Sequence, residues 1–400
     1  MNRASWAFAV LLAGAGSMPL DAQFLTENQF VDDALLNHPG ITAAEAKKAT
    51  AAGARRQAAI VSNPVISWER EEPDPALRQD TWLLNWQLPF DGRKHRKVAG
   101  DAALAAADAD LDSTQLDIRL EMRSLYAGWF IAAEREAVLQ AHLERTRRLA
   151  KWLRARAEEG EAAGVEAQRL DLEVEVFERG LVAARAEARA ERAAAANWSK
   201  LVDGEVRPKR PILPVPPATV DVANQPELLA IAYQVEEAEA VHRFRKRVFE
   251  PPSISVGWTE LGEGGLNFDG PVFGFAWPVP VFDRNQGNGD AAAAEVAHME
   301  SLLELETRQA EQRARAALAS YTTLFSAAAP LSPQTETLDV AVAVFAAFEA
   351  GEARLTDVLD ALRASVGVQM ARLESLDLAL LAERELEAAI GRPIIPGGSS

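Results

Sequence analysis

The chain carries the same succession of segments twice, and this duplication constrains its fold more than any other feature. The sequence Asn-His-Pro-Gly-Ile at residues 37–41 opens one copy, and Asn-Gln-Pro-Glu-Leu at residues 224–228 opens the other. Each opening leads into a helix-forming stretch, two short segments rich in aromatic residues, and a very long helical run broken by a glycine-containing turn. This order predicts a duplicated module of two strands followed by a long helical hairpin.

Four short segments of the chain alternate apolar and polar side chains. They cover about residues 64–71, 81–89, 253–260 and 271–279, and the stretch 261–270 between the last two contains four glycines and is predicted to be a loop. In the second of them Trp82, Leu84 and Trp86 share one face, opposite Leu83 and Asn85, and this period of two predicts a strand. Five of the nine tryptophans fall in these segments, and they form a candidate aromatic belt: Trp68, Trp82, Trp86, Trp258 and Trp277.

These strands fit either a soluble hairpin packed on a core or a transmembrane β-barrel. Their length matches the ~9–11 residues of a membrane-spanning strand. An apolar outer face with tryptophans at the interface is what a transmembrane barrel needs, and this favours the membrane interpretation. An open sheet edge is not tolerated in lipid, and four strands cannot close a useful barrel. We therefore expect several chains to share one barrel.

The rest of the chain predicts two helical hairpins, at about residues 94–201 and 289–390. Their Ala, Glu, Arg and Leu content favours helix, and the proline-free run 94–158 would reach about 90 Å as one helix. Pro330 and Pro333 predict a break in the second hairpin. Helices of this length must pack on their return helices and on neighbours. The predicted fold is mainly α with a small transmembrane β part.

The domain plan that follows is simple. The segments are a signal peptide (1–22), a first repeat (23–206), a Pro-rich linker (207–221), a second repeat (222–392) and a tail (393–400). The signal peptide is predicted from Arg3, the apolar run after it and the small residue Ala22. A short N-terminal membrane anchor is the alternative, but the apolar run is short for a span.

Composition and motifs argue against an enzyme or a nucleic-acid-binding protein. The net charge of −17 opposes phosphate backbones, and the absence of cysteine excludes disulfides, thiolate chemistry and a lipidated cysteine. We find no nucleotide-binding glycine loop, zinc-protease helix or nucleophile elbow. The five histidines are scattered, so we expect neither a metal site nor a cofactor.

The sharpest local motif is Arg-Leu-Thr-Asp-Val-Leu-Asp-Ala at residues 354–361. Asp357 and Asp360 are three residues apart, so they share one helix face. They have a simple role at a helix start, where an acid contributes about 0.3–1 kcal/mol and Thr356 or Asp357 can be the cap. In a ring of subunits the same spacing would place two tiers of carboxylates around an axis and attract cations.

With these motifs, nearly all of the mature chain resembles the TolC-type outer membrane efflux proteins. The resemblance rests on the doubled openings, the paired strands, the glycine turns and residues 354–361. It implies a trimer with a twelve-stranded barrel, a long α-helical barrel crossing the periplasm, and partners in a periplasmic adaptor and an inner-membrane pump. A resistance-nodulation-division pump is expected, although other pumps use similar conduits. The implied function is a passive exit duct for small molecules or ions in the outer membrane.

The resemblance also implies roles for particular residues. Asp357 and Asp360 match the acidic ring of the periplasmic entrance, and Arg354 matches the basic residue that ties the closed gate. Phe348 stands where the family often has a tyrosine, so this chain lacks the hydroxyl that a latch at this position would use. The first turn has no second Asp-x-x-Asp, which keeps the ring in the second copy. The implied adaptor-docking tips are Gly160, Gly164, Gly351 and Glu352.

Two other classes of protein share part of this pattern. A periplasmic coiled-coil adaptor also has a long helical hairpin, but it would carry one hairpin framed by soluble β domains. An envelope scaffold protein would have no use for four membrane-type strands. Neither alternative accounts for two hairpins that each follow a tryptophan-rich strand pair.

Overall fold

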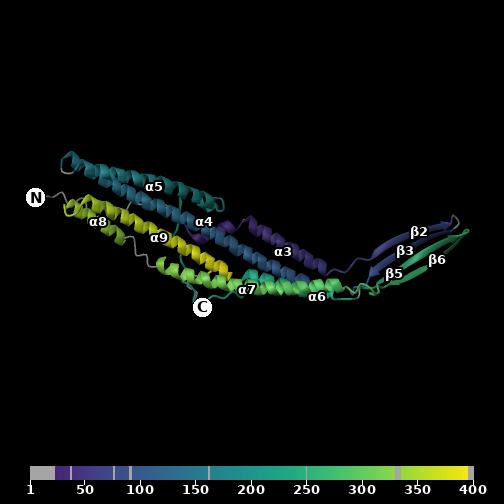
Figure 1. The fold of residues 1–400 in the computed structure, drawn as a ribbon. Coiled ribbons are helices and arrows are strands. Elements are labelled where there is room, and N and C mark those ends of the chain that lie inside the picture. The colour runs from purple at the N-terminus through teal and green to yellow at the C-terminus, as the bar shows by residue number, and fades with distance from the viewer. Residues whose placement is uncertain are drawn as a thin grey trace. The chain divides into compact units, whose positions relative to one another are not determined.

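The computed structural model describes residues 23–36, 38–74, 77–89, 92–160, 163–248, 250–328 and 335–394. The expected signal peptide, Pro330, Pro333 and most of the expected tail lie outside these residues. The described elements are β1 (Gln23–Leu25), α2 (Glu27–Leu36), α3 (Pro39–Ala58), β2 (Val65–Asp74), β3 (Leu77–Gln87), α4 (Arg93–Glu158), α5 (Gly164–Ala196), the short 3₁₀ helix η1 (Lys200–Val202), β4 (Val206–Pro208), α6 (Pro226–Arg245), β5 (Ser253–Glu263), β6 (Leu266–Ala276), α7 (Gln286–Ala328), α8 (Thr335–Glu349) and α9 (Leu355–Ile390) (Figure 1).

The chain divides into two compact units, and each unit draws on both repeats. Unit 1 comprises Met1–Ile41, Gln115–Val222 and Glu311–Ser400, and unit 2 comprises Thr42–Thr114 and Ala223–Ala310. The long helices α4 and α7 contribute residues to both units. The units therefore do not coincide with the repeats, because helices from the two copies pack together within each unit.

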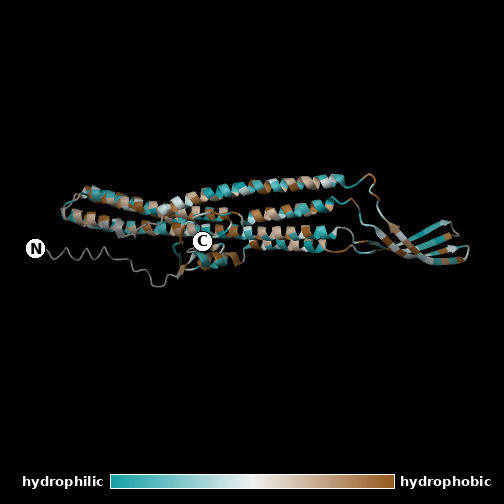
Figure 2. Cartoon of the chain, turned by 90° about the horizontal axis from the view of Figure 1, so that it is seen from below, coloured by the Kyte–Doolittle hydropathy of each residue, from teal (hydrophilic) through white to brown (hydrophobic). Residues whose placement is uncertain are grey.

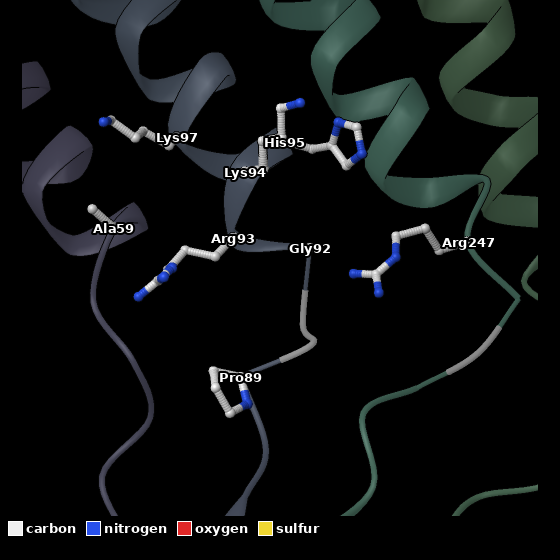
Figure 3. Close-up of a pocket in the computed structure, with 8 residues that line it drawn as sticks. All are labelled: Ala59, Pro89, Gly92, Arg93, Lys94, His95, Lys97 and Arg247. Carbon is white, nitrogen blue, oxygen red and sulfur yellow. The ribbon is translucent and has the colours of Figure 1, made fainter.

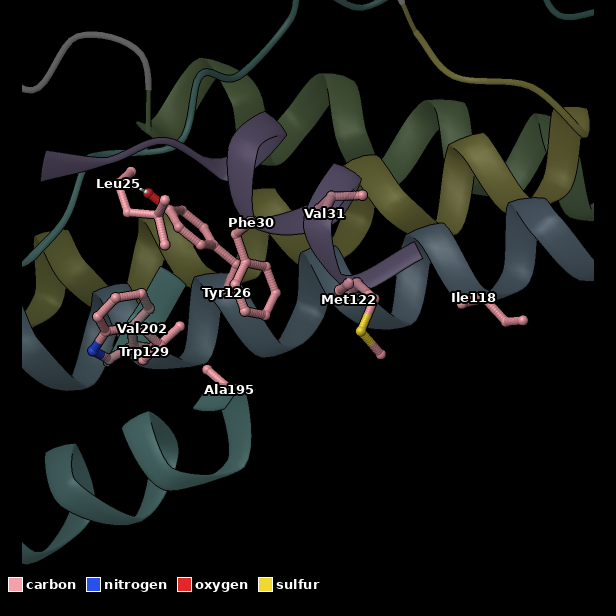
Figure 4. Close-up of a cluster of buried hydrophobic side chains, with 10 residues drawn as sticks. Leu25, Phe30, Val31, Ile118, Met122, Tyr126, Trp129, Ala195 and Val202 are labelled. Atoms are coloured by element: carbon pink, nitrogen blue, oxygen red, sulfur yellow. Dashed lines mark hydrogen bonds between the residues drawn. The ribbon is translucent and has the colours of Figure 1, made fainter. Parts of the chain in front are cut away.

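The core of unit 1 forms around Tyr126 of α4, which is completely buried (Figure 4). Its hydroxyl lies 2.6 Å from the carbonyl oxygen of Leu25 and 2.7 Å from that of Lys209. Phe30 and Trp129 pack on its ring at centroid distances of 5.7 and 5.9 Å. Since β1 also pairs in parallel with β4, these contacts fix the described N-terminus against the start of the Pro-rich linker.

Towards the turns of the hairpins, α4, α5 and α9 of unit 1 share a second apolar cluster. Its buried members include Leu153, Leu170, Val358 and Leu362. Exposed ion pairs run along the contact between α4 and α5, such as Arg135–Glu187 and Arg147–Glu178, each at 2.6 Å. Such exposed pairs contribute about 0–1 kcal/mol, so apolar burial holds the helices together.

Unit 2 contains one four-stranded antiparallel sheet in the order β2-β3-β5-β6. The strands differ from the predicted ranges: the loop expected between the last two is a tight hairpin, so β5 continues to Glu263 and β6 begins at Leu266. Gly264 and Gly265 form the turn with φ of 54° and 88°, a conformation that suits a two-residue hairpin and needs glycine. β6 ends at Ala276, ahead of Pro278, which has no N–H to donate.

Among the described helices, none combines the length and the apolar character needed to cross a bilayer.

Candidate functional site

One face of the sheet is apolar and exposed. The strand register places Trp68, Trp82 and Trp258 in one cross-strand row. The next two rows toward the helices continue this face with Ile66, Leu84, Val256 and Phe273, and then with Trp86, Ile254 and Phe275. Phe273 is 75% exposed and Phe275 is 68% exposed. Because a soluble hairpin would cover such side chains with its own core, this face favours contact with lipid.

The opposite face is more polar, although it also carries Val65, Leu83 and Val272, and several of its polar side chains form hydrogen bonds with one another. The hydroxyls of Thr81 and Thr259 lie 3.1 Å apart, and Gln79 Nε2 donates to Thr259 Oγ1 at 3.3 Å. Asn85 Nδ2 donates to Ser67 Oγ at 3.0 Å. Figure 2 shows hydrophobic and hydrophilic residues interleaved along these strands. An apolar outer face and a polar inner face are the pattern of a water-filled barrel wall.

A charged group borders the tryptophan row at the hairpin end of β2 and β3. The carboxylate of Asp80 accepts from Arg70 Nε at 2.7 Å and from Arg78 Nε at 2.8 Å. It also accepts from the indole N–H of Trp68 at 3.2 Å. Tryptophan suits a membrane interface because its ring is apolar and its N–H needs a polar partner. From Trp82 to Leu88 the apolar face covers about 20 Å at ~3.3 Å per residue, close to the ~25 Å band of outer-membrane barrels.

Each of the two hairpins of unit 1 has a glycine with a positive φ two residues after the end of the helix that precedes its turn. Gly160 ends α4 with a φ of 78°, and Gly351 follows α8 with a φ of 79°. The N–H of Glu352 donates to the carbonyl of Ala347 at 2.8 Å, which closes the end of α8 as a Schellman-type cap. Gly164 is the first residue of α5. The glycine turns are thus required by backbone conformation, which is a structural reason for them independent of any partner.

Asp357 and Asp360 lie on the exposed side of the first turns of α9, while Leu355, Val358 and Leu359 are buried. Arg354 is the N-cap residue, and the carboxylate of Asp357 accepts from its backbone N–H at 2.8 Å. Neither Thr356 nor Asp357 is the cap itself, because α9 begins at Leu355, two residues earlier than a Thr356 cap would require and three earlier than an Asp357 cap would require. Asp357 therefore stabilises the helix start whether or not it also lines a channel.

Sequence reasoning missed two contacts that hold this end of unit 1. Phe348 packs edge-on against Trp152 at 6.0 Å, and Phe345 does so at 5.7 Å, so α8 is anchored on α4. Arg363, one turn after Asp360, forms two hydrogen bonds of 3.0 and 2.6 Å with Glu173 of α5. The only sequence signal was an aromatic residue close to each turn, since the partners are far apart along the chain.

No metal centre accompanies these residues. Across the described parts of the chain, no group of three or more His, Cys, Asp and Glu side chains is arranged to hold a metal ion. The acidic pair of α9 contributes two carboxylates from one chain, so any cation site formed there would need carboxylates from further subunits.

Comparison with known proteins finds a relative by sequence and solved structures with a similar fold. No family model matches it. The cobalt-zinc-cadmium resistance protein CzcC of Cupriavidus metallidurans is 25% identical over 356 residues, which cover 85% of this chain and 84% of CzcC. The outer membrane protein VceC of Vibrio cholerae matches with a TM-score of 0.70 at 17% identity, covering 92% of this chain and 96% of VceC.

Two further solved structures agree with this result. CusC, whose structures concern folding and transmembrane channel formation, matches with a TM-score of 0.72 at 15% identity, covering 94% of this chain and 96% of CusC. The outer membrane channel CmeC of Campylobacter jejuni matches with a TM-score of 0.69 at 14% identity, covering 95% of this chain and 91% of CmeC. The predicted fold, mainly helical with strand pairs and long helical hairpins, is confirmed.

Proposed function

We propose that this chain, a TolC-type outer membrane factor by its fold and by its similarity to CzcC along most of its length, forms the exit duct of a tripartite efflux system. It is a channel protein of the outer membrane that extends into the periplasm, and not an enzyme. The observation that carries the proposal is the sheet of unit 2, which is apolar and exposed on one face and more polar on the other.

The sheet also supports a trimer. Its outer strands, β2 and β6, each have one edge that pairs with no other strand of the sheet. In lipid both edges must be closed, and three copies of a four-stranded sheet would make one twelve-stranded barrel without edges. Transport is passive, since the chain carries no nucleotide-binding glycine loop and the energy comes from an inner-membrane partner.

The cargo class we propose is small molecules or ions, with divalent metal cations as the first to test. CzcC is named for resistance to cobalt, zinc and cadmium, and the net charge of −17 favours cations over anions in the duct. The partners are a periplasmic adaptor and a pump of the resistance-nodulation-division type. The adaptor contacts the turns at Gly160, Gly164, Gly351 and Glu352, which end the two hairpins of unit 1.

The entrance of the duct is formed by the start of α9. Asp357 and Asp360 are exposed there and share a helix face, so three copies would bring six carboxylates around one axis. Arg354, which is also exposed, would tie the closed state of the entrance. The aromatic belt is Trp68, Trp82, Trp86, Trp258 and Trp277, which are between 37% and 53% exposed.

The first test is the oligomer mass of protein extracted from outer membranes in mild detergent, followed by conductance in planar bilayers. A trimer that forms channels supports the proposal. If the protein is instead a monomer in the soluble periplasmic fraction and shows no conductance in bilayers, an adaptor or an envelope scaffold becomes the better assignment.

The entrance is tested with the double variant Asp357→Asn and Asp360→Asn. Asparagine retains an oxygen that can accept from the N–H of Arg354, so the helix start is preserved while the charge is removed. We expect a several-fold fall in cation preference, because a charged ring sets ion selectivity. Glu166→Gln, in the first turn of α5, is the control and should leave selectivity unchanged. Unaltered conductance and selectivity in the double variant would show that Asp357 and Asp360 do not line the entrance.

A further inference from the structure

Unit 2 contains an open cavity with a strongly basic lining at the junction between strand β3 and helix α4. Its volume is about 710 Å³. The lining residues are Ala59, Pro89, Gly92, Arg93, Lys94, His95, Lys97 and Arg247 (Figure 3). Four of these carry a full positive charge at neutral pH, in a chain whose net charge is −17. The lining of the cavity is therefore positively charged in a protein whose net charge is negative.

The basic residues of α4 also oppose their local helix geometry. The first five residues of α4 are Arg-Lys-His-Arg-Lys, and its first turn contains no acid. The positive end of the helix dipole disfavours cations at this position. By contrast, His242, Arg243 and Arg245 lie in the last turn of α6, where the dipole favours them. The cations in the last turn of α6 thus agree with the helix dipole, and those at the start of α4 oppose it.

The second repeat shows that this basic run is not needed for the strand-to-helix connection. The corresponding helix α7 begins with Gln-Gly-Asn-Gly-Asp at residues 286–290. Around that start the chain carries one cation, Arg284, and two acids, Asp283 and Asp290. The same turn of the fold is therefore made in this protein without a cationic lining.

Packing holds Arg247 beside the start of α4. Gly92 has a φ of 75°, and a Cβ added to it would collide with Nη1 of Arg247 and with the ring of Phe244. The guanidinium of Arg96 lies over the Phe244 ring at 5.8 Å. Figure 3 shows Arg93 and Arg247 on either side of Gly92. Glycine at this position lets cations of α4 and Arg247, which follows the end of α6 and is far away in sequence, line the same cavity.

We propose that this cavity binds a phosphate group, carried by an anionic phospholipid headgroup or present as a free phosphate anion. Guanidinium groups match the oxygen geometry of phosphate, and lysines add charge around it. The lipid source rests on the proposed function, because it requires the apolar face of the sheet to lie in a membrane. That face ends near Trp86 and Leu88, directly before Pro89 of the cavity. A headgroup at the edge of the leaflet would meet the basic lining there.

The test compares full-length wild-type protein with the triple variant Arg93→Gln, Lys94→Gln and Lys97→Gln. Binding of phosphatidylglycerol and of phosphatidylcholine to the detergent-solubilised proteins is titrated by native mass spectrometry. Each basic residue near a headgroup strengthens binding about fivefold, so the triple variant should bind phosphatidylglycerol roughly 100-fold more weakly. Binding of the zwitterionic phosphatidylcholine should be weak in both proteins.

A matched control removes three positive charges elsewhere. Arg179, Arg308 and Arg315 each form an exposed ion pair with a glutamate one helical turn away, and their replacement by Gln gives the same change in net charge. The control should bind phosphatidylglycerol like the wild type. Equal binding by the triple variant and the control, or no preference of the wild type for phosphatidylglycerol over phosphatidylcholine and no binding of phosphate, would overturn the proposal.

Equilibrium dialysis with inorganic phosphate distinguishes the two sources. Binding of phosphate by the wild type, lost in the triple variant, supports the site and assigns it to the free anion. Phosphatidylglycerol binding without phosphate binding supports the site and assigns it to lipid. Conductance of both proteins in planar bilayers separates this inference from the proposed function. If the triple variant loses phosphate or lipid binding but still conducts, the site is not needed for the duct. If the wild type binds phosphate but does not conduct, the proposed duct is refuted and the binding site is not.

Discussion

A buried cluster of charges in unit 1 gives the sharpest test of the packing between α4 and α9. The side chain of Arg123 is 13% exposed, and it forms ion pairs with Glu27, Glu383 and Glu387. Its Nε lies 2.7 Å from Glu27, and its Nη2 lies 2.8 and 3.0 Å from the two carboxylate oxygens of Glu383. Replacement of Arg123 by Met keeps the apolar stem and removes all of these hydrogen bonds.

The charges of this cluster do not balance when all are ionised. Arg384 is a second buried guanidinium beside Arg123, so two positive charges meet three carboxylates. Burial raises the pKa of Glu383 to about 7, against the pull of Arg123 and with the help of Glu387. A single proton on Glu383 would make these five groups neutral, but burial, which disfavours the charged carboxylate, is the main cause of the raised pKa.

We expect Arg123→Met to lower the free energy of unfolding by about 3–5 kcal/mol at pH 8, because it leaves buried carboxylates without their counter-charge. The loss should be smaller at pH 5. Without Arg123 the folded-state pKa values of these carboxyls rise further above the unfolded value, so the folded form binds more protons than the unfolded form. The stability of the variant therefore falls as pH rises from about 5 to 8, more steeply than that of the wild type.

The assay is denaturant unfolding of the detergent-solubilised protein, followed by helical circular dichroism at both pH values. Arg135→Met is the control, since Arg135 and Glu187 form an exposed pair worth at most about 1 kcal/mol. Adding Glu383→Gln and Glu387→Gln to Arg123→Met should recover part of the loss. A loss at pH 8 no larger than that of Arg135→Met, or one that does not shrink at pH 5, would refute this account of the cluster.

Two further predictions concern unit 1. His142 is buried against Phe177, and burial, with Arg145 nearby, lowers its pKa to about 4. The stability that neutral His142 contributes is present above pH 6.5 and is lost as pH falls toward 4, by roughly 3 kcal/mol. His142→Leu should therefore make the free energy of unfolding less dependent on pH between 6.5 and 4. An identical pH dependence in wild type and variant would contradict this prediction. Gly351→Ala should lower the free energy of unfolding by about 1 kcal/mol because of its φ of 79° alone, since no atom lies near the added Cβ. Gly367→Ala within α9 also places its Cβ in open space and should raise the free energy of unfolding by about 0.5–1 kcal/mol. Denaturant midpoints that move in the same direction for both variants would contradict this prediction.

The strands and hairpins could be predicted from sequence because their signals are local. Period-two alternation placed Trp82, Leu84 and Trp86 on one face, and the register confirms that they share it with Trp258. The turn at Gly264 and Gly265 was predicted as part of a longer loop, since four nearby glycines resemble a flexible connection. In the structure only two of them bend the chain, and the others continue as strand because the register holds them.

The contacts that fix the helices against one another could not be predicted in the same way. Glu383, Arg384 and Glu387 look like a solvated helix face in the sequence, yet they are buried because α4 brings Arg123 to them from far along the chain. No local pattern in the sequence indicates the contact of Arg123 with Glu383 and Glu387. The same holds for Glu173 and Arg363, and for the lining of the basic cavity, where Gly92 and Arg247 come from opposite repeats.

The two repeats carry different charges at two pairs of corresponding helix starts. The basic run at the start of α4 has no counterpart at the start of α7, and the acidic pair at the start of α9 has none at the start of α5. Both differences lie at helix starts, and the side chains of Lys94, Lys97, Asp357 and Asp360 are exposed there. Since a duplicated scaffold meets the same structural demands in each copy, charges present in only one copy are poorly explained by those demands. In the proposed trimer, turns with the acidic pair would alternate with turns that lack it, so three of the six hairpins would carry the carboxylates of the entrance. Replacing Asp357 and Asp360 would then remove the charge of the whole ring and leave the other three hairpins unchanged.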